Sequence, residues 1–282
     1  MNYLKLCVVQ EDLVIPDVQV EGMRLSILAS GSSGNAVYLE SSETSVLIDV
    51  GLSGQEISSR LNRIGVSPES IGHIVITHEH SDHLSGAGIF SRRYNVPIYL
   101  HPEVKENSHK RLGKLKDVFY FESDEEFEVG DMIFEPFSVS HDAVSPVGFC
   151  IHCNGNKASL ATDLGVATNL VIDKIKNSDV LIIESNHDEE LLIDGPYPWY
   201  LKQRIKSNKG HLSNNQSNEL LESVWHDGIK HVYLAHLSEN NNLPNLALSS
   251  AVNTVENITG SDKFSDIVHL TYQKEPTSLI KF

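Results

Sequence analysis

Short apolar runs, separated by glycine, serine, asparagine and aspartate, make up most of the chain from Met23 onward. Many of these runs are rich in β-branched residues and are bounded by turn formers, a pattern that predicts β-strands. The segments that contain predicted strands are residues 24–30, 36–41, 45–51, 73–77, 96–102, 125–141, 148–155, 157–165, 180–188 and 231–241. We expect the first three to form a meander.

Helical patterns alternate with these strands. One of them places Ile57, Leu61 and Ile64 at the i, i+4, i+7 spacing of an amphipathic helix. Helices are predicted at residues 55–66, 85–95, 168–179 and 213–228, the last of them capped by Ser213 or Asn214, and a final helix and strand follow. The alternation of the two patterns predicts a mixed α/β fold.

The first 22 residues differ from the rest of the chain. Gly22 separates them from Met23, where the strand pattern begins. Three interpretations stay open: an added edge strand, an upstream translation start, or an arm that contacts a partner. The sequence contains no tandem repeat or linker beyond this point. It therefore predicts an extension of unknown role at residues 1–22 and a single domain at residues 23–282.

Composition and charge narrow the function classes. The 282 residues are 40% hydrophobic and 21% charged, as in chains that fold around their own core. The net charge of −16 opposes long-range capture of nucleic acid or of an anionic membrane, so phosphate chemistry requires local positive charge. Three cysteines without a secretory leader favour the cytoplasm. No apolar run approaches the roughly 20 residues of a membrane span.

The strongest chemical signal is an H-x-H-x-D-H motif directly after the predicted strand at residues 73–77. Its ligand-type residues are His78, His80, Asp82 and His83. Side chains at the end of a strand can converge on one point, and imidazole and carboxylate groups are ligands of Zn, Mn and Fe. Chance clustering of these residue types is rare. The motif therefore predicts a metal site.

Three further ligand-type residues occupy the same context elsewhere. His141, Asp163 and His236 each follow an apolar run of strand character. Alone, none of them distinguishes a metal ligand from a structural residue. If the four strand ends meet on one rim of a sheet sandwich, they bring seven ligands to two metal ions.

These residues resemble the metal-binding motifs of the metallo-β-lactamase superfamily, from Met23 to the C-terminus. The resemblance implies an αββα sandwich of two mixed β-sheets, with metal ions at one edge of the sheets. It also implies seven ligands: His78, His80 and His141 for the first metal, Asp82, His83 and His236 for the second, and Asp163 as a bridge. Asp49 matches an aspartate of the family that supports the metal loop through hydrogen bonds.

Flanking segments narrow the resemblance further. They are LASGSSGNA at residues 28–36, ESNHD at 184–188, GHLSN at 210–214 and AHLSENNN at 235–242. Together they are similar to the YycJ/WalJ group of bacterial phosphodiesterases. This similarity implies a DNA 5′-exonuclease, with nucleic acid as substrate. Residues 1–22 have no counterpart in the pattern.

The resemblance implies hydrolysis by two divalent ions, Zn or Mn, with Fe also compatible. Ions about 3.5 to 4 Å apart lower the pKa of a bridging water, so that a bridging hydroxide becomes the nucleophile. Asp82 would orient this hydroxide. We expect His211, on a loop before a helix, to protonate the leaving group, although a structural role at the helix entry stays open.

Other residues are expected to contact substrate. The SGSSGN loop offers hydroxyls and backbone N–H groups for a phosphate, with Ser33 and Asn35 as the candidate binding residues. His187 follows a strand and is a candidate for substrate contact or ligand support. Two basic stretches could follow a nucleic-acid backbone or lie on a solvated surface: Lys105, His109, Lys110, Arg111, Lys114 and Lys116, and Lys202, Arg204, Lys206 and Lys209.

Two features are discounted or left open. Cys150 and Cys153 lie three apart in a strand pattern, so their side chains should point to opposite faces and share neither a disulfide nor a metal. The ligand set alone does not fix the substrate. A cyclic ribose phosphodiesterase or a glyoxalase II-like thioesterase is the main alternative to an exonuclease, and a non-catalytic metal-binding scaffold is another.

Overall fold

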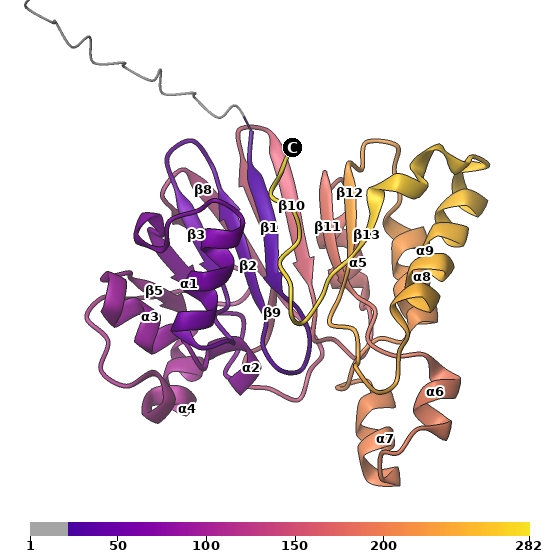
Figure 1. Cartoon of the computed structure of the whole chain (residues 1–282), viewed down its shortest axis with the longest axis horizontal. Coiled ribbons are helices and arrows are strands. Elements are labelled where there is room, and N and C mark those ends of the chain that lie inside the picture. Colours follow the sequence, from indigo (N-terminus) through magenta and orange to yellow (C-terminus); the bar gives the residue numbers. More distant parts are fainter. Residues whose placement is uncertain (1–21) are drawn as a thin grey trace, which may run out of the picture.

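The computed structural model describes residues 22–282, so the expected extension at residues 1–22 lies outside it apart from Gly22. Two seven-stranded β-sheets pack face to face, and helices cover both outer faces (Figure 1). This arrangement confirms the αββα sandwich expected from the sequence.

The first sheet is built mainly from the N-terminal half. Its order is β14 (Ile280–Lys281), β1 (Arg24–Ala29), β2 (Ala36–Glu40), β3 (Ser45–Ile48), β4 (His73–Val75), β5 (Ile98–Leu100) and β6 (Val118–Tyr120). β1, β2 and β3 pair antiparallel, which confirms the predicted meander. From β3 to β6 the pairing is parallel.

The second sheet contains the middle and the end of the chain. Its order is β13 (Val268–Leu270), β12 (His231–Ala235), β11 (Val180–Glu184), β10 (Asn156–Ala161), β9 (Val147–Cys153), β8 (Met132–Ser138) and β7 (Phe127–Val129). β7 to β10 pair antiparallel and β10 to β13 pair parallel. Both sheets are therefore mixed.

Helices α1, α3 and α4 pack on the first sheet, and α5, α8 and α9 pack on the second. The helices are α1 (Gly54–Arg63), α2 (Ser81–Leu84), α3 (Ala87–Tyr94), α4 (Pro102–Leu112), α5 (Asn169–Ile175), α6 (Glu189–Asp194), α7 (Trp199–Lys206), α8 (Asn214–Val224) and α9 (Pro244–Thr259), with 3₁₀ turns η1 (Pro68–Ser70) and η2 (Asp262–Ile267). The cap of α8 is Ser213, whose hydroxyl and the Gln216 side chain form a reciprocal capping box.

Sequence patterns did not predict α2, α6, α7 or β6. These elements are short, and α2 begins inside the histidine motif, where the side chains serve the site rather than an apolar face. Elements of three to eight residues carry too few apolar positions to define a period.

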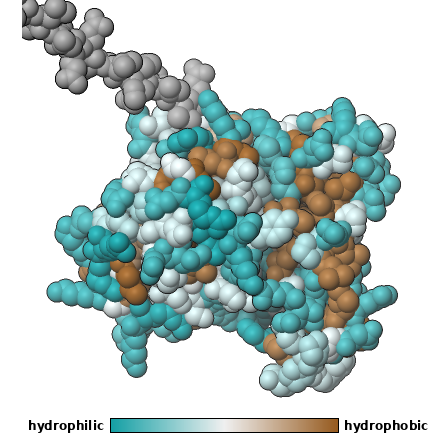
Figure 2. Space-filling view, viewed as in Figure 1, coloured by the Kyte–Doolittle hydropathy of each residue, from teal (hydrophilic) through white to brown (hydrophobic). Residues whose placement is uncertain are grey.

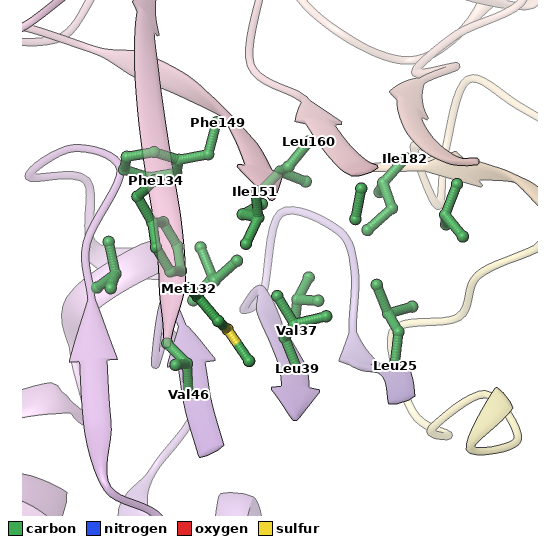
Figure 3. Packing of buried hydrophobic residues seen from close by; sticks show 14 of the residues in the cluster. Leu25, Val37, Leu39, Val46, Met132, Phe134, Phe149, Ile151, Leu160 and Ile182 are labelled. Atoms are coloured by element: carbon green, nitrogen blue, oxygen red, sulfur yellow. The ribbon is translucent and has the colours of Figure 1, made fainter. Parts of the chain in front are cut away.

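The core between the sheets is formed by side chains from both inner faces. Figure 3 shows Phe134 and Phe149 of the second sheet facing the layer that contains Val37, Leu39 and Val46 of the first. All five side chains are buried. Aromatic rings interlock here, with the rings of Phe134 and Phe149 packed edge to face at 5.6 Å.

Strand β11 is buried on both faces. In β11, Val180 and Ile182 join the core between the sheets, whereas Leu181 and Ile183 join the core under the helices. Successive side chains of a strand point to opposite faces, so a strand covered on both sides needs a continuous apolar run. This agrees with the uninterrupted apolar pattern of the segment.

The two cysteines of β9 follow the same rule. Cys153 lies in the core between the sheets, and Cys150 lies under the helices. Both are free thiols. The prediction that their side chains point to opposite faces is confirmed.

The surface carries separate apolar patches. In Figure 2 most of the visible face is hydrophilic, and the larger brown areas lie over the right-hand part, where α8, α9 and the last strands run. Within residues 22–282, no helix is both long enough and apolar enough to span a membrane.

Candidate metal centre

Strand ends bring the site together at one rim of the sandwich. Asp49 follows β3, Asp163 lies just after β10, and His236 follows β12. All three have left-handed backbones, with φ of 62°, 57° and 57°. Such a conformation costs a non-glycine residue about 1–3 kcal/mol and is common at functional sites, where the surrounding contacts maintain it.

The first group of donors consists of His78, His80 and His141, whose ligand atoms lie within 4.8 Å of one another. His80 Nδ1 is 3.3 Å from His141 Nε2. The Thr77 hydroxyl lies 2.9 Å from His78 Nδ1, and the Gly210 carbonyl lies 3.2 Å from His141 Nδ1. These contacts leave the Nε2 atoms of His78 and His141 for a ligand. The three histidines expected at the first metal are thus together.

Asp163 lies at the centre of the cluster and is buried. Its Oδ2 atom is 3.2 Å from His83 Nε2, and its Oδ1 atom is 3.5 Å from His236 Nδ1 and 3.8 Å from His141 Nε2. Burial disfavours the charged carboxyl, but the surrounding histidines outweigh it and hold the pKa of Asp163 well below its usual range. The carboxylate is ionised and reaches both groups of histidines.

The residues expected at the second metal also converge. Asp82 Oδ2 lies 3.6 Å from His83 Nε2 and 3.9 Å from His236 Nε2. Asp82 is half-buried, whereas the two histidines are buried. The Asp82 carboxylate therefore lies within 4 Å of the Nε2 atoms of both histidines.

Asp49 supports the loop from below. Its carboxylate accepts hydrogen bonds from the Thr77 N–H and hydroxyl, both at 2.9 Å, and lies 2.7 Å from His83 Nδ1. Bonding at Nδ1 leaves His83 Nε2 directed at Asp163 and Asp82. The hydrogen-bonding position agrees with the supporting role implied by the resemblance, and such contacts orient metal-binding histidines in proteins.

Close backbone packing fixes the histidine motif in place. Asn35 N–H donates to the Asp82 carbonyl at 2.7 Å, and Gly51 N–H donates to the Asn35 carbonyl at 2.9 Å. A Cβ on Gly51 would lie 1.7 Å from the Asp82 carbonyl oxygen. Glycine is therefore required at this position, because any side chain would displace the motif.

Sequence reasoning missed Glu184, the last residue of β11. Its Oε1 atom lies 2.8 Å from Nδ1 of both His211 and His236, and its Oε2 atom accepts from the Leu164 and Leu212 N–H groups. The side chain is fully buried, and although burial opposes ionisation, the two histidines lower its pKa to about 2. One carboxylate thus orients two imidazoles.

The structure differentiates the other candidate residues. His211 lines the cavity above the cluster, and its Nδ1 is engaged by Glu184. His187 is 2% exposed and does not line that cavity. Burial lowers the pKa of His187 to about 4, so its ring is neutral. Substrate contact by His187 and its support of the metal ligands both stay predictions.

The SGSSGN loop offers fewer free N–H groups for a phosphate than expected. The N–H groups of Gly31, Ser33, Gly34 and Asn35 already donate to protein oxygens. Asn35 Nδ2 lies 3.0 Å from His83 Nε2, so this amide contacts the histidine motif. Ser32, not Ser33, lines the cavity. The binding roles of Ser33 and Asn35 stay predictions.

The cavity above the cluster has a volume of about 240 Å³. Besides the ligand-type residues, its walls include Ser32, Asn186, Tyr197, Leu201, Arg204, Ile205, His211 and Ser238. Helix α7 thus forms one side. Lys202 was expected to contribute to the second basic stretch, and this expectation is wrong. The side chain is buried, and its ammonium group donates to the carbonyls of Ile193 and Gly195.

The donor set fits a divalent metal. Within the described residues, His78 Nε2, Asp163 Oδ2 and His236 Nε2 are buried atoms without a hydrogen-bond partner. Buried polar groups are normally hydrogen-bonded, so three such atoms in one cluster indicate that the cluster suits a metal ligand set. Imidazole nitrogens and carboxylate oxygens are the donors that Zn, Mn and Fe accept.

Comparisons with known proteins agree with this geometry. Residues 29–197 match the family model of the metallo-beta-lactamase superfamily. Exodeoxyribonuclease WalJ of Streptococcus pneumoniae is 43% identical over 237 residues, which are 82% of this chain and 88% of the relative. Exodeoxyribonuclease YycJ of Bacillus anthracis is 35% identical over 260 residues, 92% of this chain and 98% of the relative.

Among solved structures, the metallo-beta-lactamase fold protein YhfI of Bacillus subtilis superposes with a TM-score of 0.69 at 17% identity. It covers 91% of this chain and 99% of that chain. At this identity the likeness concerns the fold alone. The resemblance found in the sequence motifs is confirmed, and the chain belongs to the metallo-beta-lactamase superfamily.

Proposed function

We propose that this protein is a metal-dependent exodeoxyribonuclease, a hydrolase that cleaves phosphodiester bonds from an end of a DNA strand. The observation that carries the proposal is the cluster of seven ligand-type side chains, with unpaired buried donor atoms, in a chain 43% identical to a named exodeoxyribonuclease. Action at a 5′ end and a cytoplasmic location stay predictions.

Two divalent ions would be held at this rim. His78, His80 and His141 are the proposed ligands of one, and Asp82, His83 and His236 those of the other, with Asp163 shared between them. The central position of the Asp163 carboxylate, within 4 Å of histidines from both sets, supports the shared role. The donor types are compatible with Zn, Mn and Fe, and metal availability often decides between them.

The ions, when bound, supply a water of lowered pKa and stabilise the charge that develops on phosphate. Asp82, half-buried at the cavity wall, accepts a hydrogen bond from the attacking water and orients it. His211 faces the same cavity with its Nδ1 held by Glu184, so its Nε2 is available to protonate the departing oxygen. The ionised Glu184 stabilises the positively charged imidazole that this role requires.

The net charge of −16 opposes the approach of DNA, and positive charge close to the site would offset this repulsion. Divalent ions and Arg204 in the cavity wall would attract a phosphodiester at short range. Capture is therefore expected to depend on the site, and less on the overall field of the protein.

A small-molecule hydrolase is the second candidate. A thioesterase is disfavoured because the segment after α8 alternates β12, α9 and β13, and is not an all-helical substrate domain. A cyclic ribose phosphodiesterase would use the same metals, but the relatives of high identity carry exodeoxyribonuclease names. Retention of all seven ligand types also argues against a non-catalytic scaffold.

A time course on three substrates tests the proposal. Protein loaded with Mn or Zn would be incubated with an end-labelled linear DNA duplex, a cyclic ribose phosphate and a glutathione thioester. We expect progressive, metal-dependent shortening of the duplex. An intact duplex with hydrolysis of either small substrate would contradict the proposal, and bound metal without any turnover would favour a scaffold.

A further inference from the structure

A second cavity opens beside the metal centre. Its volume is about 490 Å³, and its walls are Glu79, His80, Ser81, Asp82, Asn107, Arg111 and Arg204. His80, Asp82 and Arg204 also line the cavity over the metal ligands. The two cavities therefore share a wall, and a strand whose phosphate lies at the metals can continue into the second one.

Two arginines from opposite elements face this second cavity. Arg111 belongs to the end of α4 and Arg204 to α7, and both helices lie at the same end of the sandwich as the histidine motif (Figure 1). Arg111 Nη1 donates to the Glu79 carbonyl at 2.9 Å, and Arg204 Nε donates to Asp142 at 2.5 Å. Each guanidinium is thus oriented by one bond and keeps further N–H donors for a ligand.

The acidic groups nearby are engaged elsewhere. Both carboxylate oxygens of Glu79 accept from the Val144 N–H, and Asp142 is paired with Arg204. Asp82 is among the proposed metal ligands. The unused N–H groups of the two arginines are therefore the free polar contacts that suit an anion, and paired guanidinium groups bind phosphate well.

An exposed aromatic ring lies on the same helix. Tyr200 precedes Arg204 by four residues on α7, so both occupy one helical face. Tyr200 is 75% exposed. An exposed ring one helical turn from an arginine of the cavity wall is a typical platform for stacking an unpaired base.

We propose that this cavity between α4 and α7 binds the DNA strand next to the cleaved bond, with Arg111 and Arg204 on its phosphate and Tyr200 against a base. The inference rests on the proposed exodeoxyribonuclease function and assigns the path of its substrate. It gives a chain of net charge −16 two guanidinium contacts to a polyanion directly beside the site.

Kinetics of the metal-loaded protein on two substrates test this path. The first is an end-labelled DNA duplex, and the second is bis(p-nitrophenyl) phosphate, which has one phosphodiester bond and no neighbouring nucleotides. Arg111→Ala and Tyr200→Ala should each raise KM for DNA by about tenfold. The ratio of kcat/KM for DNA to that for the ester should fall accordingly. In Arg111→Ala the dependence of log KM on log salt should also become shallower by about one.

Matched variants lie away from the cavity. Arg63→Ala removes an exposed arginine at the end of α1, and Tyr120→Ala removes a ring that is 57% exposed on β6. Neither should change KM for DNA. The Arg111 bond to the Glu79 carbonyl also stabilises the histidine motif. An equal loss of kcat/KM on both substrates in Arg111→Ala would therefore indicate a damaged metal site. In that case the KM of Tyr200→Ala for DNA decides whether the proposed path is correct.

The outcomes separate the two proposals. If DNA is degraded but KM in Tyr200→Ala and Arg111→Ala matches that in the control variants, the path is wrong and the function stands. If the wild-type protein hydrolyses the ester but leaves DNA intact, the exodeoxyribonuclease function is wrong and the path with it.

Discussion

Glu184 Oε1 lies 2.8 Å from Nδ1 of His236, inside a fully buried pocket of the rim. The same oxygen is equally close to His211 Nδ1. The carboxylate thereby directs one imidazole toward the metal ligands and the other toward the substrate cavity. A single buried charge therefore links a proposed metal ligand to the residue proposed to move a proton.

Glu184→Gln should therefore weaken both functions. The amide of glutamine carries no negative charge, so it holds the two imidazoles less strongly than the carboxylate does. We therefore expect metal affinity to fall by about 10- to 100-fold and turnover to fall with it. Competitive zinc titration and metal counting after dialysis measure the first effect. Glu189→Gln, at a carboxylate bonded to the Ser213 hydroxyl, is the control. Equal metal affinity in both variants would contradict the orienting role.

Metal loading should depend on pH. Burial opposes the charge on His236, but the Asp163 and Glu184 carboxylates outweigh it and raise the pKa of His236 to about 9 in the metal-free protein. A ligand histidine must be neutral, so a metal ion displaces this proton at pH 7. Affinity should rise about tenfold per pH unit between pH 7 and 9. Calorimetry in two buffers of different ionisation enthalpy measures the released proton, and no release would contradict the assignment.

His187 should make the fold sensitive to acid. Burial lowers its pKa to about 4, whereas an unfolded histidine titrates near about 6.5. Between these values only the unfolded chain takes up the proton, so stability falls as pH drops from 6.5 to 4. His187→Gln should reduce this slope by about 1.4 kcal/mol per pH unit. Urea unfolding across the pH range checks it, with the exposed His109→Gln as control. Identical slopes in all three proteins would refute this account.

The aromatic cluster between the sheets should carry much of the stability. Phe134 is fully buried and packs against Phe127 and Phe149. Phe134→Ala should lower the free energy of unfolding by about 3–5 kcal/mol, through lost burial and the cavity left behind. Its neighbour Ile133 is 40% exposed, so Ile133→Ala should cost much less. Chemical denaturation of both variants compares them, and similar losses would mean that the core is placed wrongly.

Local patterns predicted most strands of the two sheets and placed several ligand-type residues at strand ends. His78, His141 and His236 each follow an apolar strand, and the parallel strands of the two sheets end at a common rim. A motif of neighbouring residues at the end of a strand can therefore be located from the sequence, because the strand fixes its position in the fold.

Glu184 could not be found in this way. It ends the apolar run of β11, and its function depends on His211, 27 residues later, and His236, 52 residues later. The chain returns to Glu184 twice, through α6 and α7 to His211 and through α8 and β12 to His236. Lys202 was also misjudged for want of its distant contacts. Its charge suggested an exposed position, but the side chain is buried and its ammonium group donates to the carbonyls of Ile193 and Gly195.

The most direct test of the metal centre is a comparison of wild-type protein with Asp163→Asn. Asparagine tolerates the left-handed backbone at this position, so the fold should persist. For each protein, bound metal would be counted and shortening of an end-labelled DNA duplex followed with Mn and with a chelator. We predict that the wild type binds two ions and degrades DNA only with metal, whereas Asp163→Asn melts similarly, loses metal and leaves the duplex intact. Full degradation by Asp163→Asn would contradict the central role of this carboxylate.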